Sequence, residues 1–304
     1  MMHKTILITG ANAGLGKESA RQFAMRPEVE KIYLGVRNVA KGEAAKAELE
    51  EKTGKKVFEV LKIDVSDLES CKAAIANLSA GIDVLVMNAG GMSVRDTLKT
   101  NSKGVINMYA VNMLGHSYLL KELLNQNKLR HVALYIGSEA ARGMKGLAPK
   151  PDLGDFSESL IKSVIDGSYG PNQENERLTY GSIKLIGAMW MSALSRKHAG
   201  IKFVTVSPGG TRGTNAFKNA PLPMRMVFKI IMPIMGLFGK FHKLEVGAKR
   251  YVDAVTEEQY KSGVFYASKT DSPTGELADQ VMFLPEFYNE TYQENVYRVV
   301  SSYI

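Results

Sequence analysis

A glycine-rich turn near the start of the chain constrains the fold more than any other feature of the sequence. An apolar stretch, Lys4–Ile8, leads into this turn, and a helix-like stretch, Lys17–Met25, follows it. In such a strand–turn–helix unit, backbone N–H groups approach a diphosphate closely, and the N-terminus of the helix adds positive partial charge. The pattern predicts a dinucleotide-binding unit. The residues of the turn expected to contact the ligand are Gly10, Asn12, Ala13, Gly14, Leu15 and Gly16.

Apolar, β-branched runs alternate with helix-like segments along most of the chain. The predicted strands are Thr5–Thr9, Lys31–Val36, Lys56–Ile63, Asp83–Met87, His131–Gly137, Lys202–Ser207 and Gly263–Ala267. The predicted helices between the early strands are Gly14–Met25, Val39–Thr53, Leu68–Leu78 and Lys103–Asn125. This alternation predicts an α/β fold, a Rossmann-type doubly wound parallel sheet of about seven strands with helices on both faces. Ligands of such sheets bind at the carboxyl ends of the strands.

The composition is that of one globular α/β domain. With 304 residues, of which 45% are hydrophobic, the chain can bury a full core, and we expect a single domain over residues 1–304. Two stretches depart from the strand–helix rhythm. Residues 139–176 carry Pro149, Pro151 and Pro171 and are predicted to form an insert with a short helix near Ser157–Ile165. The other stretch, residues 221–243, is discussed below.

Charge and cysteine content exclude several classes of function. The net charge is +8, but the basic residues are scattered, so a phosphate-bearing cofactor explains them better than nucleic acid. The single cysteine, Cys71, excludes an internal disulfide and suits a cytoplasmic location, and Ile6–Ile8 is too short for the apolar core of a signal peptide. The five histidines lack ligand spacing, so no metal is expected. We expect a small-molecule substrate and a monomer or small homo-oligomer.

Four residues are candidates for catalysis. Tyr180 and Lys184 are four residues apart and share one face of a helix, and a neighbouring ammonium favours the phenolate. We therefore expect Lys184 and a nicotinamide cation together to lower the pKa of Tyr180. Ser138 follows a predicted strand, where its hydroxyl can donate to a substrate carbonyl. Asn112 lies inside a predicted helix although asparagine is a poor helix former, and it can hold a water in a relay to Lys184. Each residue alone also fits an ordinary structural position, so the prediction depends on their combination.

Small and polar residues follow two further predicted strands. Asn88, Ala89 and Gly90 come directly after Asp83–Met87, and such a turn lets the backbone pass close to a ligand. Asp64 closes the third predicted strand. There it either accepts a hydrogen bond from an adenine amino group or caps the next helix.

The combined motifs resemble those of the short-chain dehydrogenase/reductase family over residues 4–214, and more loosely beyond. The matching segments are Thr9–Gly16, Asp64–Val65, Asn88–Gly90, Asn112, Ser138, Tyr180–Lys184 and Ser207–Thr211. The resemblance implies a nicotinamide cofactor, Tyr180 as acid/base, Lys184 on the nicotinamide ribose, Ser138 on the carbonyl and Asn112 in the relay. It also implies contacts of Pro208, Gly209 and Thr211 with the nicotinamide end.

The residue after the second predicted strand indicates which cofactor is used. An acidic residue there would pair with the ribose hydroxyls of NAD, whereas Arg37 suits the 2′-phosphate of NADP. Many NADP-preferring members also carry a basic residue where this chain has Ala13, and Lys17 can partly substitute. We therefore predict NADP(H). The expected cofactor-binding residues are Gly10, Asn12, Ala13, Gly14, Leu15, Gly16, Arg37, Asn38, Asp64, Val65, Asn88, Ala89, Gly90, Tyr180, Lys184, Pro208, Gly209 and Thr211.

Within the family, the insert and the tail resemble those of light-dependent protochlorophyllide reductases. The similar segments are Pro149–Asp155, Ile165–Gly167, Glu245–Arg250 and Lys261–Tyr266. Those enzymes carry a cysteine where this chain has Gly210, so the resemblance concerns the scaffold rather than photochemistry.

The apolar, methionine-rich stretch 221–243 has two interpretations. It fits a substrate lid at about residues 212–245, because methionine-rich surfaces adapt to bulky ligands. It also fits peripheral contact with a membrane, since Lys229, Lys240 and Lys243 flank the apolar residues, but it is too short to span one. We favour the lid.

These observations predict an NADP(H)-dependent oxidoreductase that acts on a carbonyl or alcohol, with a bulky, apolar substrate. Two alternatives stay open. One is reduction of a carbon–carbon double bond, as in protochlorophyllide reductases, and the other is a non-catalytic NADP sensor on the same fold. The complete set of four candidate catalytic residues argues against the sensor.

Overall fold

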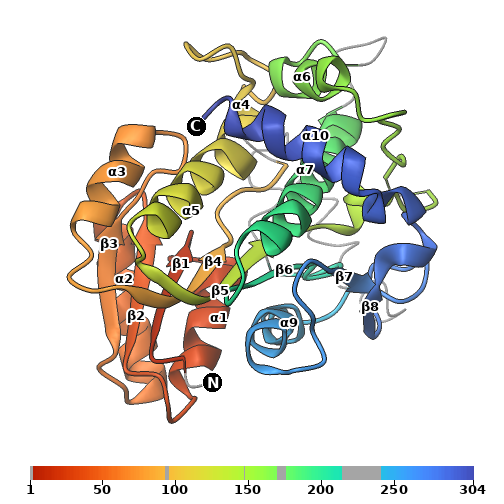
Figure 1. Ribbon diagram of the computed structural model, residues 1–304. Helices are drawn as coiled ribbons and strands as arrows, with labels where there is room; N and C mark the ends of the chain where they lie inside the picture. Colours follow the sequence, from red (N-terminus) through yellow and green to blue (C-terminus); the bar gives the residue numbers. More distant parts are fainter. Residues whose placement is uncertain (1–2, 93–95, 147, 170–175, 214–240) are drawn as a thin grey trace.

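The computed structural model describes residues 3–92, 96–146, 148–169, 176–213 and 241–304. Within them the chain forms one eight-stranded sheet in the order β3-β2-β1-β4-β5-β6-β7-β8 (Figure 1). The strands are β1 Thr5–Thr9, β2 Lys31–Val36, β3 Phe58–Lys62, β4 Ile82–Met87, β5 Leu129–Ile136, β6 Lys202–Val206, β7 Phe265–Ser268 and β8 Leu277–Asp279. Neighbouring strands from β3 to β7 pair in parallel, and β8 joins β7 antiparallel.

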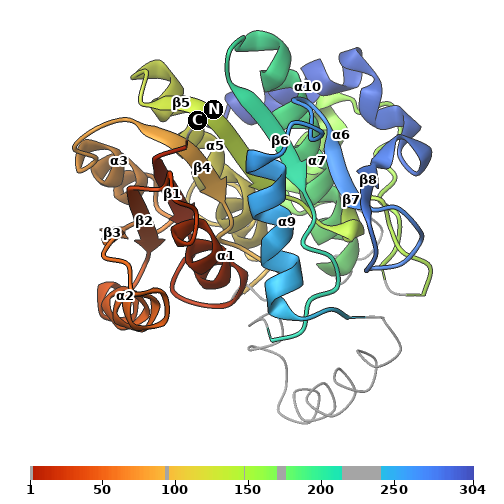
Figure 2. The same ribbon diagram turned by 90° about the horizontal axis from the view of Figure 1, so that it is seen from below.

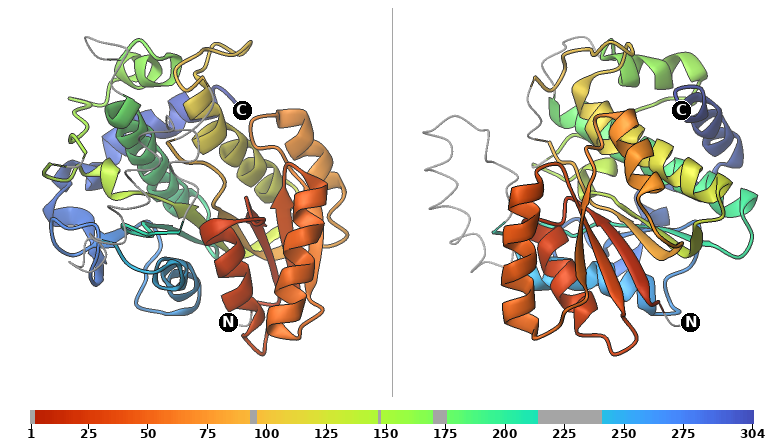
Figure 3. Two further views of the ribbon diagram at one scale, coloured as in Figure 1. Left: turned by 180° about the vertical axis from the view of Figure 1, so that it is seen from behind. Right: turned by 90° about the vertical axis from the view of Figure 1, so that its left-hand side faces the viewer.

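Helices cover both faces of the sheet. One face carries α1 (Gly14–Ala24), α2 (Val39–Thr53) and α9 (Leu244–Thr256), which lie together below the strands in Figure 2. The opposite face carries α3 (Leu68–Ala76), α5 (Gly115–Asn125) and α7 (Glu176–Lys197). The C-terminal helix α10 (Glu290–Ser301) packs on the outside of α7 and against α6 (Glu158–Asp166), as two views in Figure 3 show.

The central strands are buried because both of their faces are covered. Every residue of β4 is buried, and Ile6, Leu7 and Ile8 of β1 have no exposed surface. Uninterrupted apolar strands are what a parallel sheet between two helix layers requires. The strand order reverses between β1 and β4, and a crevice at that point is where such sheets bind ligands.

The predicted α/β fold is confirmed, with differences at two elements. All seven predicted strands are present, and β8 was missed because it has only three residues. The predicted helix Lys103–Asn125 starts at Asn107 and contains α4 (Asn107–Tyr109), a π-helical turn over Ala110–Leu114, and α5. The short helix expected near Ser157–Ile165 is α6.

The structure describes most of the predicted insert but only the ends of the predicted lid. Most of the insert 139–176 is described, and it holds a 3-10 turn at Glu139–Ala141 and α6. Residues 214–240 lie outside the described part of the chain, so the interpretation of 221–243 as a lid stays a prediction. Among the described helices, none combines the length and apolar character that crossing a membrane would need.

Candidate active site

The glycine turn places backbone close to backbone at the carboxyl end of β1. Gly10 has a φ of 69°, and a Cβ there would lie 3.0 Å from Cα of Ala89. A Cβ on Gly16 would lie 2.5 Å from Nδ2 of Asn88 and 2.6 Å from the Gly10 carbonyl oxygen. Larger side chains at these two positions would push the turn away from β4. The turn is therefore held compact by contacts that only glycine permits.

Helix α1 begins without a side-chain cap. Its N-cap residue is Ala13, which forms no capping hydrogen bond, and no acidic residue lies in the first turn. The first N–H groups of a helix have no intrahelical partner and carry positive partial charge. An uncapped helix start behind a glycine turn suits an anionic group such as a diphosphate.

A cleft of about 590 Å³ opens over this turn and across the ends of β4, β5 and β6. Most of the predicted site residues line it. They are Gly10, Asn12, Ala13, Gly14, Leu15, Arg37, Asn88, Ala89, Gly90, Ser138, Tyr180, Lys184, Pro208, Gly209 and Thr211. Residues that sequence reasoning did not single out also line it, among them Gly91, Glu139, Phe241 and Tyr251.

Five predicted site residues do not line the cleft, and four of them, Gly16, Asn38, Asp64 and Val65, lie in the surrounding structure. Gly16 packs against Asn88, as described above. The Asn38 side chain accepts a hydrogen bond from the N–H of Lys41 at 2.9 Å and so caps α2. Asp64 accepts hydrogen bonds from N and Oγ of Ser66, and one of its oxygens lies 3.8 Å from Nε of Arg37. Val65 is buried.

Asn112, the fifth, braces the loop after β4 from beneath. Its side chain is fully buried, and its Oδ1 accepts from the N–H of Gly91 at 2.9 Å while its Nδ2 donates to the carbonyls of Gly91 and Met108 at 3.0 Å. The side-chain amide is therefore occupied by backbone, which leaves only the Asn112 carbonyl for a relay. That carbonyl already accepts a hydrogen bond from the Tyr135 hydroxyl at 3.2 Å.

Ser138 and Tyr180 meet at the end of β5. Ser138 precedes the 3-10 turn Glu139–Ala141 and caps it, its Oγ accepting from the N–H of Ala140 at 3.2 Å. Burial raises the pKa of Tyr180 to about 12, although a hydrogen bond with Ser138 acts in the opposite direction. The Lys184 ammonium lies 5.7 Å from the centre of the Tyr180 ring, and the expected lowering of this pKa, which also requires the nicotinamide cation, stays a prediction.

Lys184 is buried and loses affinity for its proton. Its Nζ donates a hydrogen bond to the carbonyl of Ile136 at 2.9 Å and lies 4.9 Å from the centre of the Tyr135 ring. Burial lowers the pKa of Lys184 to about 7. The group can therefore gain or lose a proton near neutral pH, which suits proton transfer.

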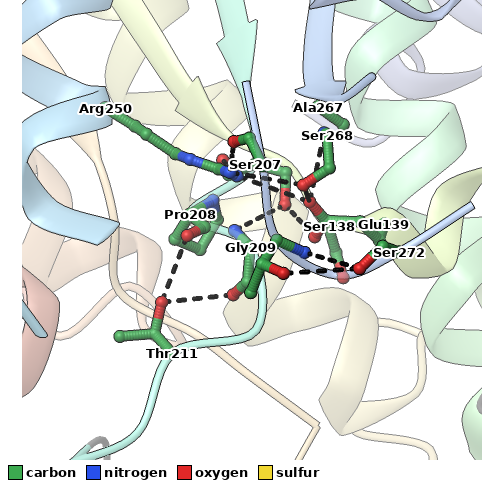
Figure 4. Close-up of polar contacts among 12 residues, drawn as sticks. Ser138, Glu139, Ser207, Pro208, Gly209, Thr211, Arg250, Ala267, Ser268 and Ser272 are labelled. Carbon is green, nitrogen blue, oxygen red and sulfur yellow. Dashed lines mark hydrogen bonds and ion pairs between the residues drawn. The ribbon is translucent and has the colours of Figure 1, made fainter. Parts of the chain in front are cut away.

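A buried polar cluster behind Ser138 was missed by sequence reasoning (Figure 4). Ser207 donates to one Glu139 oxygen, and Ser268 donates to the other at 3.1 Å. Arg250 of α9 lies 3.6 Å from the Glu139 carboxylate and donates to the Ser207 carbonyl at 3.1 Å. The cluster ties β6, β7 and α9 to the residue next to Ser138. The only sequence signal is that Glu139 follows Ser138.

The turn after β6 is braced by its own hydrogen bonds. The Thr211 hydroxyl donates to the carbonyls of Pro208 and Gly209 at 3.1 and 3.2 Å. The His242 ring Nε2 lies 2.7 Å from the Pro208 carbonyl oxygen and 3.0 Å from Thr211 Oγ1. The predicted contact residues Pro208, Gly209 and Thr211 are thus held facing the cleft.

The geometry fits a dinucleotide. The cleft runs from the exposed Arg37 past the uncapped start of α1 to Tyr180 and Lys184, and it is floored by glycine-rich backbone. A phosphate-bearing ligand would find N–H donors and a cation at one end, and titratable hydroxyl and amine groups at the other. Among the described residues, no group of three or more histidine, cysteine, aspartate or glutamate side chains is arranged to hold a metal ion.

Comparison with known proteins finds one matching family model and several similar dehydrogenases. Residues 4–144 match the family model described as short chain dehydrogenase. Retinol dehydrogenase 12 of Mus musculus is 37% identical over 214 residues, which cover 68% of this chain and 61% of that protein. The NADP-dependent 3-hydroxy acid dehydrogenase of Schizosaccharomyces pombe is 35% identical over 174 residues, 54% of this chain and 66% of that protein. This chain therefore spans less than two thirds of the length of these relatives.

Solved structures share the fold. The crystal structure of L-sorbose reductase from Gluconobacter frateurii, complexed with NADPH and L-sorbose, superposes with a TM-score of 0.63. It covers 87% of this chain and 94% of its own, at 19% sequence identity. A short-chain dehydrogenase/reductase from Brucella melitensis superposes with a TM-score of 0.62 at 20% identity, covering 87% of this chain and 96% of its own.

Proposed function

We propose that this chain, whose residues 4–144 belong to the short-chain dehydrogenase family, is an NADP(H)-dependent oxidoreductase that transfers a hydride between nicotinamide and a carbonyl or alcohol. The observation that carries the proposal is the meeting of Ser138, Tyr180 and Lys184 in one cleft with an uncapped helix N-terminus. The family match supports an oxidoreductase, and the carbonyl or alcohol substrate is the part that we propose in addition.

The two ends of the cleft would hold different parts of the cofactor. The glycine turn and the first N–H groups of α1 would bind the diphosphate. The loop Asn88–Gly90 and the turn Pro208–Thr211 would hold the nicotinamide half. The nicotinamide, when bound, supplies or accepts the hydride.

Arg37 supports NADP(H) over NAD(H). Its side chain is 77% exposed, and its one ion pair among the described residues, with Asp64, is a long contact of 3.8 Å. The guanidinium is therefore available to bind a 2′-phosphate, and charge-assisted hydrogen bonds of this kind are worth about 1.5–3 kcal/mol. One relative is named as NADP-dependent, and the L-sorbose reductase structure contains NADPH, which supports the same choice.

Proton transfer would involve three side chains. The Ser138 hydroxyl, oriented by the Ala140 N–H, donates to the substrate oxygen and fixes its position. Tyr180 is protonated at neutral pH because burial raises its pKa to about 12, so it can donate its proton to that oxygen in the direction of reduction. Lys184, whose pKa of about 7 lies near ambient pH, can hold or release a proton one helical turn from Tyr180.

The test is NADPH oxidation over a panel of ketones and aldehydes, followed at the absorbance of the reduced nicotinamide. We expect turnover with at least one carbonyl compound and weaker activity with NADH. Tight NADPH binding without turnover of any carbonyl, alcohol or enone would favour the non-catalytic sensor. The expected preference for bulky, apolar substrates depends on residues 221–243, most of which lie outside the described residues, and it stays a prediction.

A further inference from the structure

A second cavity, of about 600 Å³, lies near the first, and its charged lining residues are mainly cations. Its charged lining residues are Arg142, Lys145, Lys150, Arg177 and Asp271, four cations against one carboxylate. None of its lining residues belongs to the lining of the dinucleotide cleft. Its charge is therefore not explained by the cofactor.

The cavity lies close to the candidate catalytic residues. Arg177 precedes Tyr180 by three residues on α7, so the two side chains lie on one face of the helix, about 5–6 Å apart at Cβ. The segment leading from Ser138 to Arg142 packs directly on the same helix, because a Cβ on Gly181 would lie 2.5 Å from the Ala140 carbonyl oxygen. The cavity therefore lies within about one helical turn of the candidate acid Tyr180.

Arg142 is a buried cation that forms no ion pair within the described ranges, although Glu139 and Asp271 attract its charge from a greater distance. Its side chain is 3% exposed, and its guanidinium lies 4.3 Å over the Phe283 ring and donates to the Thr270 carbonyl at 2.7 Å. Its Nε and Nη1 are buried with no hydrogen-bond partner in the described part of the chain. Burial lowers the pKa of Arg142, which reflects the unfavourable free energy of this charge.

The nearby carboxylates do not neutralise the cavity. Glu139 is paired with Arg250, and Asp271 is exposed. Lys150 pairs with Glu286 at 3.3 Å, but Lys145 and Arg177 form no ion pair within the described ranges. An anion placed here would therefore face a net positive field, to which the buried Arg142 contributes a charge that water screens poorly.

We propose that this cavity binds a carboxylate or phosphate group of the substrate, so that the enzyme acts on an acidic carbonyl compound held by its charged end. This inference rests on the proposed function and deepens it by naming the substrate class. Arg177 and Lys145 would contact the anion directly, while Arg142, held under the cavity, would add a fixed charge.

The test compares matched substrates that differ only in charge. Oxo acids with different separations between the carbonyl and the carboxylate are each paired with their methyl esters, and NADPH oxidation is followed for each pair. We expect kcat/KM for the best acid to exceed that of its ester by about 10–100-fold, the contribution typical of one charge-assisted hydrogen bond. Arg177→Gln and Lys145→Gln should lower kcat/KM for the acid more than for its ester and so reduce this preference. Arg26→Gln, a distant exposed arginine, is the matched control.

The outcomes separate this inference from the proposed function. Turnover of esters and neutral ketones with no advantage for any acid would overturn the proposal that the cavity binds an anion. It would leave the proposed oxidoreductase function supported. If no carbonyl compound is turned over, calorimetric titration with glutarate or inorganic phosphate tests anion binding by the cavity independently of catalysis. Binding that is lost in the Arg177→Gln, Lys145→Gln double variant but kept in Arg37→Gln would support it. Binding that is absent, or insensitive to these substitutions, would overturn it.

Discussion

Glu139 and Arg250 form a buried ion pair of 3.6 Å, and Glu139 is the residue next to Ser138. Both side chains are about 95% buried, so neither charge is stabilised by water. Hydrogen bonds from Ser207 and Ser268 complete the carboxylate shell, and the Arg250 guanidinium also donates to the Gly275 carbonyl at 2.7 Å. The pair therefore fixes the end of β5 relative to the turn after β6 on which the nicotinamide end would rest.

Removing one partner of this pair should destabilise the fold strongly. Glu139→Gln leaves Arg250 buried without its counter-charge, and the free energy of unfolding should fall by about 3–5 kcal/mol. Urea denaturation measures the change, and Glu30→Gln, in the exposed Lys4–Glu30 pair, should change it by at most about 1 kcal/mol. Glu139→Gln combined with Arg250→Met should recover part of the loss. Equal, small effects of Glu139→Gln and Glu30→Gln would show that the buried pair does not brace the site.

Arg37 should determine cofactor preference. Arg37→Asp removes the proposed 2′-phosphate contact and places a second carboxylate beside Asp64, so NADPH affinity should fall by roughly 10–100-fold or more. NADH affinity should change much less. Fluorescence titration with both cofactors measures this, with Arg26→Asp as the control. Equal affinities of the unaltered protein for NADPH and NADH would contradict the prediction.

Tyr180→Phe should remove turnover but not cofactor binding. The ring stays and only the transferable proton is lost, which typically lowers the rate by a factor of about 10²–10⁴. NADPH affinity should stay within a few-fold of the original value, and Tyr118→Phe on α5 is the control. Retained activity of the Phe variant on accepted carbonyl substrates would mean that another group supplies the proton.

Lys184 should make the protein more stable as the pH rises from about 7 to 10. Burial lowers its folded pKa to about 7, well below that of a free lysine, so in this window the unfolded chain binds a proton that the folded chain does not. One such proton raises the free energy of unfolding by about 1.4 kcal/mol per pH unit. Lys202, with a pKa lowered to about 8, adds a similar contribution in all variants.

The difference between the unaltered protein and Lys184→Met isolates the Lys184 contribution. Denaturation at a series of pH values should give a smaller slope for the Met variant between pH 7 and 10. Parallel slopes would indicate that Lys184 keeps an ordinary pKa.

The protein should not reduce protochlorophyllide under light. Gly210 lines the cleft where the light-dependent enzymes place a cysteine, and its N–H donates to the Pro273 carbonyl. Illumination with NADPH and protochlorophyllide should give no chlorophyllide above a dark control. Its formation would favour double-bond reduction as the activity.

Sequence patterns predicted the parts of the site that depend on local backbone. The glycine turn, the strand ends and the Tyr180–Lys184 helix follow from spacing, and the structure brings them into one cleft. The Glu139–Arg250 pair joins residues distant in the sequence, and no local pattern marks it. The raised pKa of Tyr180 in the protein alone reflects burial, and the degree of burial depends on the tertiary structure rather than on a local pattern. The side-chain role of Asn112 depends on a π-helical turn that residue propensities do not encode.

That π-helical turn also makes the chain length in this region critical. In Ala110–Leu114 the N–H of Gly115 bonds to the carbonyl of Ala110, five residues back instead of four, so the turn contains one residue more than an α-helical turn. Deleting a single residue such as Val111 would restore α-helical spacing and rotate the preceding segment by about 100° relative to α5. The Met108 carbonyl, which lies before the deletion, would then turn away from the Asn112 amide that donates to it, and Asn112 would be held less firmly under the loop. A frame-preserving deletion should therefore do more harm here than most substitutions of the same residue.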